Sequence, residues 1–126
     1  MKPHEEWLTK AEHDLSAAKV LIDSDNELSD VAIYHTQQCG EKALKAYLAF
    51  LDFEIEKTHN LKVLLEKCRT SDKSFETLIY DANFINPYST AFRYPDSGEI
   101  PDNETVLEAI NSAEKILNFV KDKIKA

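Results

Sequence analysis

Glycine and proline are scarce in this chain. Its 126 residues include 2 glycines and 4 prolines, which leaves few positions for the tight turns that join the strands of a β-sheet. The apolar residues do not alternate with polar ones, as they would in half-buried strands. Both observations favour helices, and at this length we expect a single domain spanning residues 1–126.

Cysteines and long apolar runs are also few. Cys39 and Cys68 cannot form the disulfide framework of a small secreted domain. No apolar run approaches the ~18 residues that a membrane-spanning helix requires, and the initial Met-Lys-Pro-His-Glu-Glu does not read as a signal peptide. We therefore expect a cytoplasmic protein without membrane contact.

Basic residues are too few for a general nucleic-acid-binding protein. Lys and Arg number 15 against 23 Asp and Glu, which gives a formal net charge of −8 at pH 7. Such proteins gain most of their affinity by neutralising phosphates, so this chain repels a polyanion on average. Any contact with a nucleotide or RNA would depend on a local basic patch.

Helical periodicity is the strongest pattern that the chain does have. Apolar residues spaced three to four positions apart predict a first helix over residues 3–23. A second helix can be capped by Ser29 or Asp30 and ends near Phe53. Thr58 is a suitable cap for a short third helix that carries Leu61, Leu64, Leu65 and Cys68.

Two further helices are predicted in the second half of the chain. One covers residues 75–85, after which Pro87 would kink or restart the helix, so that residues 88–92 continue at a new angle. Residues 93–98 read as a turn because they combine Pro, Asp and Gly.

The start of the last helix has two competing caps. Asp102 or Asn103 can cap it, and Thr105 with Glu108 forms an alternative capping box. Because the connections are short, neighbouring helices should be antiparallel. The predicted fold is therefore an all-α up-and-down antiparallel bundle of four long helices plus one short helix.

The second helix carries the best candidate for a functional surface. Its polar face collects His35, Gln38, Glu41, Lys42 and Lys45 at spacings of three and four. Lysine can hold a phosphate as a compact charge, and glutamine can contact a base edge or a ribose. The alternative is a solvated face on which Glu41 and Lys45 form a weak i,i+4 pair.

Two loops add further candidates. Arg93 can bind a phosphate bidentately and Tyr94 can stack on a base. The structural alternatives are that Arg93 ties its loop to an acidic helix end or pairs with Glu41, while Tyr94 plugs the bundle. His59 could act as a general acid or base, or could only hydrogen-bond the start of the third helix.

The sequence contains no motif for a cofactor or a metal. His35 and Cys39 lie four residues apart, but two ligands do not make a site and Cys39 falls on the apolar face. There is no glycine-rich phosphate loop and no paired-cysteine motif. We expect neither cofactor nor metal.

Four short motifs occur together in a recognisable order. They are Trp7…Ala11…Asp14-Leu15…Ala18, then His35-x-x-Gln38-x-x-Glu41-Lys42-Ala43-Leu44-Lys45-Ala46, then Thr58-His59-x-Leu61, and finally Arg93-Tyr94-Pro95-Asp96. In this order and spacing the chain resembles the HEPN family (higher eukaryotes and prokaryotes nucleotide-binding domain), in its small stand-alone prokaryotic branch.

The resemblance implies a helical bundle that is usually homodimeric and often produced beside a minimal nucleotidyltransferase. Many such pairs are toxin–antitoxin systems, and some of the helical subunits are metal-independent ribonucleases. That activity is associated with an Arg followed four to six residues later by His. Neither Arg69 nor Arg93 is followed by a histidine at that distance, so the ribonuclease assignment does not carry over.

Three functions stay open. The leading hypothesis is a non-catalytic subunit that contacts a nucleotide or short RNA, acting as a homodimer with a minimal nucleotidyltransferase. The second is a divergent metal-independent ribonuclease toxin, in which His59 or His35 moves protons beside Arg93. The third is a purely structural protein-interaction module. The residues expected to bind the nucleotide or phosphate are His35, Gln38, Lys42, Lys45, His59, Arg93 and Tyr94.

Overall fold

The computed structural model describes residues 1–24, 26–95 and 100–125. These residues form helices and connecting turns, with no β-strand among them. None of the helices described is long and apolar enough to cross a membrane. The α-helices are α1 (Pro3–Ser24), α2 (Ser29–Phe50), α3 (Leu61–Ser71), α4 (Ile79–Ile85) and α5 (Asn103–Lys125), and the 3-10 helices are η1 (Asn26–Leu28), η2 (Lys73–Leu78) and η3 (Asn86–Ser89).

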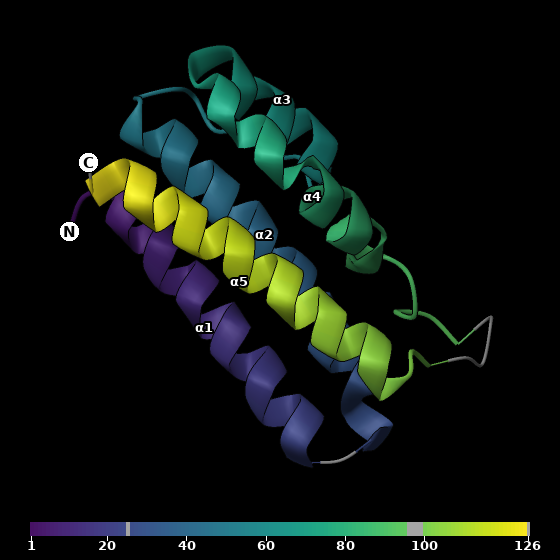
Figure 1. Cartoon of the computed structure of the whole chain (residues 1–126). Helices are drawn as coiled ribbons and strands as arrows, with labels where there is room; N and C mark the ends of the chain where they lie inside the picture. The colour runs from purple at the N-terminus through teal and green to yellow at the C-terminus, as the bar shows by residue number, and fades with distance from the viewer. Residues whose placement is uncertain (25, 96–99, 126) are drawn as a thin grey trace.

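The helices pack as one bundle with α2 in its interior (Figure 1). α1 lies on one side of α2 and α5, and α3 and α4 lie on the other. The predicted all-α bundle is confirmed, with antiparallel packing of α1 on α2 and of α4 on α5. The helix lengths differ from the prediction, since three helices are long and both α3 and α4 are short.

Two of the packed pairs run in parallel, contrary to the prediction of antiparallel neighbours: α2 with α5, and α2 with α3, the next α-helix along the chain. Asp52 adopts a left-handed backbone with φ 62°, and the Phe53 N–H donates to the Leu48 carbonyl at 3.0 Å. This Schellman-type closure ends α2 at Phe50, earlier than the predicted Phe53. The chain then returns along α2 before α3 begins, so the His59 carbonyl lies 2.8 Å from Gln37 Nε2 near the middle of α2.

The start of α3 differs from the prediction as well. Asn60, not Thr58, is the N-cap, because its side-chain oxygen accepts a hydrogen bond from the Lys62 N–H at 2.9 Å. The Thr58 hydroxyl instead accepts from the Asn60 N–H at 3.1 Å. Asn86 Oδ1 accepts from the Leu61 N–H at 2.8 Å, which ties the end of α4 to the start of α3.

The predicted helix over residues 75–85 is divided into two parts. Its first residues belong to the 3-10 helix η2, and a regular α-helix starts only at Ile79. Pro87 lies in the first turn of a new 3-10 helix, η3, where its missing N–H is tolerated. The predicted helical continuation to Phe92 ends at Ser89, and Phe92 itself has a positive φ of 66°.

The last connection is only partly described. The predicted turn over residues 93–98 includes residues 96–98, which lie outside the described part of the chain. At the start of α5, Asp102 Oδ1 accepts from the Thr105 N–H at 2.8 Å. Of the two predicted capping arrangements, the structure therefore contains the one in which Asp102 caps the helix.

Gly40 sits where three helices meet α2. A Cβ atom at this position would lie 2.8 Å from Ile85 Cδ1 and 3.5 Å from both Ile116 Cδ1 and Leu61 Cδ1. These three isoleucine and leucine side chains are fully buried. The missing side chain of Gly40 thus lets α3, α4 and α5 approach the central helix closely.

Candidate functional site

Three residues of the polar face of α2 are buried and the other two, His35 and Lys42, are half-buried, so this face is not the solvated one of the alternative. Gln38 is 9% exposed, Glu41 4% and Lys45 5%. Asp14 of α1 covers one part of this face, and His59 of the segment before α3 covers another. Charges at this depth persist only where each is paired and hydrogen-bonded.

Glu41 is the centre of one polar group. Its Oε2 accepts a hydrogen bond from Lys45 Nζ at 2.9 Å, and its Oε1 lies 2.9 Å from His59 Nδ1. Lys45 Nζ also lies 5.6 Å from the centroid of the Trp7 ring. The charge of Lys45 is therefore compensated by a carboxylate and an aromatic face.

Two glutamines complete the group around Glu41. Gln38 Nε2 donates to Gln37 Oε1 at 2.8 Å, and Gln37 Nε2 donates to the His59 carbonyl at 2.8 Å. Gln37 is fully buried. The amide chain thus fixes the segment before α3 against α2, and the exposed ring of His59 is attached at its Nδ1 side.

Asp14 is the centre of a second polar group. Its Oδ2 accepts from Lys42 Nζ at 2.7 Å, and its Oδ1 lies 2.8 Å from His35 Nδ1. Asp14 is 7% exposed. Each of the two buried carboxylates therefore holds one lysine and one histidine, and neither Lys42 nor Lys45 presents an uncompensated charge.

His35 also borders a hollow of about 310 Å³ between α2 and the residues that follow η3. Arg93 lies on its other side, with Cζ 4.0 Å from the centroid of the Tyr34 ring, in cation–π geometry. Among the described residues no carboxylate forms an ion pair with Arg93. The remaining lining residues are Asp30, Val31 and Phe92.

Phe92 is held in an unusual backbone conformation at this hollow. Its φ of 66° is in the left-handed region, which is rare for a bulky side chain. Residues kept in such conformations concentrate at functional sites, because the surrounding structure must offset the strain. The second described non-glycine residue with a positive φ, Asp52, closes the end of α2, whereas Phe92 lines the hollow.

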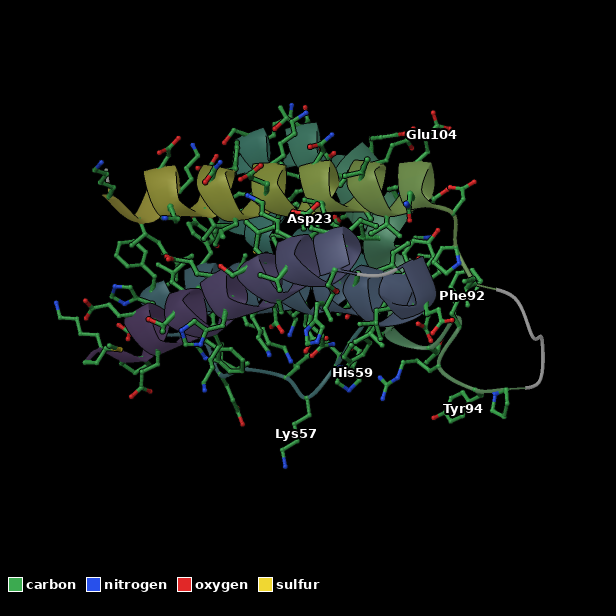
Figure 2. The ribbon with its side chains drawn as sticks, turned by 90° about the horizontal axis from the view of Figure 1, so that it is seen from below. Asp23, Lys57, His59, Phe92, Tyr94 and Glu104 are labelled. Carbon is green, nitrogen blue, oxygen red and sulfur yellow. The ribbon has the colours of Figure 1, made fainter. Side chains whose placement is uncertain are left out.

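The residues predicted from sequence occupy four different places. Arg93 does not pair with Glu41, because Lys45 and His59 occupy that carboxylate. Tyr94 does not plug the bundle but is 68% exposed, and Figure 2 shows both Tyr94 and His59 on the side away from α5. His35 and Arg93 share the hollow, Gln38, Lys45 and His59 surround Glu41, Lys42 binds Asp14, and Tyr94 projects outward.

Several residues of these groups were not predicted as site residues, among them Asp14, Tyr34, Phe92 and Gln37. Asp14 could have been found, because it is a carboxylate on the apolar stripe that carries Ala11 and Ala18. Tyr34 and Phe92 are aromatic residues at helical spacings, which is more typical of a core or an interface than of a binding site. Nothing in the sequence indicates that residues 34 and 92 line the same hollow. No pattern in the sequence indicates that Gln37, the neighbour of the predicted Gln38, belongs to a polar group.

Neither cysteine has the chemistry of a ligand or nucleophile. Burial raises the pKa of the Cys39 thiol far above its usual value, and burial raises the pKa of Cys68 to about 12. Both thiols are therefore protonated at neutral pH. In the described ranges, no three His, Cys, Asp or Glu side chains gather as a metal site would require.

The fold and the site define a small helical-bundle domain with an ion-paired central helix and an arginine-bearing loop beside it. The model of the HEPN domain matches residues 4–123. The chain therefore belongs to the HEPN family.

Relatives with names and structures extend this comparison. "Putative toxin MJ1304" of Methanocaldococcus jannaschii is 31% identical over 134 residues, covering 94% of this chain and 86% of that protein. The crystal structure of ST0689, an archaeal HEPN homologue, superposes with a TM-score of 0.77 at 31% identity, covering 98% of this chain and 99% of that chain. TT1696 from Thermus thermophilus has a TM-score of 0.84 at 26% identity, with the same coverage.

Proposed function

We propose that this chain is the HEPN subunit of a toxin–antitoxin-like pair and contacts a nucleotide or short RNA without cleaving it. It acts as a homodimer together with a minimal nucleotidyltransferase. The name of the M. jannaschii relative supports the toxin–antitoxin context. The observation that carries the binding role is the hollow at Arg93 and Tyr34.

The size and chemistry of the hollow suit one nucleotide unit. A volume of about 310 Å³ is at the lower end of the range of about 300–1,000 Å³ for small-molecule sites. Arg93 can donate two hydrogen bonds to a phosphate, and the rings of Tyr34 and Phe92 offer stacking surfaces for a base. The net charge of −8 opposes the approach of a long polyanion.

The other predicted residues have different roles, and those around Glu41 do not line this hollow. Lys42 and His35 share the Asp14 carboxylate, so Lys42 fixes that carboxylate and thereby the His35 ring. Since Nδ1 of His35 is bound to Asp14, Nε2 is left for the ligand. Lys45, Gln38 and His59 hold the segment before α3, and Tyr94 adds an exposed ring next to Arg93.

Ligand-induced thermal stabilisation tests the binding role. ATP, GTP or the dinucleotide UpU should raise the melting temperature of the full chain, because a ligand that binds only the folded state stabilises it. Arg93→Ala should abolish the rise while leaving the melting temperature of the free protein unchanged. The matched control is Lys57→Ala, which removes an exposed cation from the side of the molecule that also carries Tyr94 (Figure 2). A ligand effect that survives Arg93→Ala would refute the assignment.

One observation favours a second candidate, metal-independent RNA cleavage. His35 lies at the same hollow as Arg93, so a histidine from α2 could replace the one missing downstream of Arg93. Its orientation by the buried Asp14 is typical of a histidine that transfers protons. Cleavage of a labelled RNA that persists in EDTA, is lost in His35→Ala and is retained in His59→Ala would favour this enzyme over the binding subunit.

A further inference from the structure

A line of aromatic rings follows α4, η3 and the turn after them. Tyr80, Phe84, Tyr88 and Phe92 recur every four residues, and the centroids of successive rings are 6.1, 6.3 and 6.0 Å apart. We call these four side chains the aromatic line. Tyr80 is 70% exposed, while the other three are half-buried. The aromatic line therefore has one largely exposed ring, Tyr80, at its first end and continues as partly exposed rings to Phe92.

A small hollow of about 220 Å³ lies beside the first two rings, between α4 and α5. Asp81, only 6% exposed, lines it together with the exposed residues Glu108 and Asn111. Asp81 Oδ1 accepts from the Ser112 hydroxyl at 2.9 Å. No described residue donates a hydrogen bond to Asp81 Oδ2.

Asp81 Oδ2 is able to accept a hydrogen bond from an incoming donor. Lys115 Nζ lies 3.5 Å from Oδ2 and forms only a long ion pair from an exposed position. A buried carboxylate oxygen without a hydrogen bond is costly, and native structures contain few of them. Glu108 has no ion-pair partner in the described part of the chain.

The negative charge continues along the aromatic line. Burial raises the pKa of Tyr88, and the nearby carboxylates of Asp102 and Glu108 raise it further. Three carboxylates, those of Asp81, Asp102 and Glu108, thus lie near the rings, with Lys115 as the cation at the hollow. This surface repels phosphates and attracts a cation that has an apolar body.

Guanidinium satisfies both features of the surface at once. It donates paired hydrogen bonds to a carboxylate and stacks on aromatic faces, whereas an ammonium is a compact, strongly hydrated charge. The volume suits one side chain and is below the range of about 300–1,000 Å³ typical of small-molecule sites. We infer that the hollow between α4 and α5 receives an arginine side chain of a protein partner, bound by Asp81 and Glu108 and stacked on Tyr80 or Phe84.

Two other occupants fit the surface less well. RNA would bring phosphates towards the three carboxylates. A second copy packed around a two-fold axis at this surface would place the same acids opposite each other. The inference is separate from the proposed nucleotide site, although Phe92 belongs both to the aromatic line and to the hollow at Arg93. A partner held along the line could therefore reach the nucleotide site.

Titration of the isotopically labelled full chain with N-acetyl-arginine amide, followed by NMR, tests the inference. We expect saturable millimolar binding that shifts the resonances of Tyr80, Phe84 and Ser112. The citrulline analogue, which has the same shape without the charge, should bind at least fivefold more weakly. Tyr80→Ala and Glu108→Gln should each weaken arginine binding at least fivefold. Both residues are exposed, so the fold should persist.

The control variant is Glu6→Gln, which removes an exposed acid from α1 on the other side of the bundle (Figure 1). It should leave arginine binding unchanged. Equal shifts with arginine and citrulline, or none at α4 and α5, would overturn the inference. So would shifts of the same resonances by a uridine hexanucleotide, or conversion of a dimer to a monomer by Tyr80→Ala in sedimentation. If arginine binds as expected but UpU does not bind at the Arg93 hollow, only the proposed nucleotide site is contradicted.

Discussion

Two buried carboxylates determine how much positive charge the central helix presents. Asp14 neutralises Lys42, and Glu41 neutralises Lys45, at distances of 2.7 and 2.9 Å. Lysines three residues apart on a polar helix face look like a phosphate site when only that helix is considered. Asp14 of α1 and Glu41 of α2 pair with these lysines, so the lysines belong to the packed bundle. Arg93 is then the cation at the hollow that Tyr34 and Phe92 line.

Glu41→Gln should strongly destabilise the protein. The substitution leaves Lys45, whose side chain is 7% exposed, charged and unpaired in the interior. Removing one partner of such a pair typically costs about 3–5 kcal/mol of unfolding free energy. Urea denaturation followed by circular dichroism measures this loss.

Glu66→Gln is the matched control for that experiment. Glu66 pairs with Arg69 at 2.9 Å but is 65% exposed, so its loss should cost less than about 1 kcal/mol. In the double variant Glu41→Gln/Lys45→Gln, part of the lost stability should return. Equal small effects for Glu41→Gln and Glu66→Gln would show that the interior pair is not what holds this face.

Asp72 should contribute to the loss of stability in acid. The hydrogen bond from Lys123, followed by those from Ser74, lowers the pKa of Asp72 to about 2 from the ordinary 3.8. A lowered pKa in the folded state means stabilisation above pH 3.8 that is lost as the pH falls towards 2. The unfolding free energy between about pH 4 and about pH 2 should therefore fall less steeply in Asp72→Asn than in the parent chain. An unchanged slope in urea titrations would contradict this.

At the scale of elements, the position of α3 depends on the return of residues 51–60 along α2. The left-handed Asp52 turns the chain back, and Gln37 fixes the returning segment through the His59 carbonyl. α3 therefore starts beside Gly40 and runs parallel to α2. This arrangement also brings Leu61, Ile85 and Ile116 to one point on the central helix.

Gly40→Val should destabilise the bundle by about 1–3 kcal/mol, since it adds three carbon atoms where the first already lies 2.8 Å from Ile85 Cδ1. Gly40→Ala should be close to neutral. The better helix propensity of alanine, worth about 1 kcal/mol, offsets a contact that a movable methyl group can relieve. Thermal and urea denaturation compare the two. Equal losses for alanine and valine would mean that glycine is needed for another reason.

Periodicity along the chain was enough to predict the all-helical bundle and the approximate position of each helix. It was not enough to predict that α2 ends at Phe50 and that α3 begins at Leu61. These boundaries depend on Asp52 adopting a positive φ and on Asn60 capping α3. The shared hollow of Tyr34 and Arg93 could not be predicted either. It depends on tertiary packing between residues far apart in the sequence.

At the scale of the whole molecule, two chemically different surfaces are connected. The hollow at Arg93 offers a cation and aromatic rings, and the hollow at Asp81 offers carboxylates and aromatic rings. The aromatic line runs from one to the other and ends at Phe92. The proposed nucleotide and the inferred protein partner would thus occupy separate but adjoining places on one HEPN domain.

Isothermal titration of UpU into Arg93→Gln and Lys42→Gln, each paired with a urea denaturation, compares the two cations. We predict that Arg93→Gln lowers the affinity at least tenfold with unchanged stability. Lys42→Gln should lose stability, because Asp14 then loses its lysine, while the folded fraction still binds UpU within about threefold of the parent. The reverse pattern, with binding lost in a fully stable Lys42→Gln and retained in Arg93→Gln, would contradict the assignment of the lysines to the scaffold and of Arg93 to the ligand.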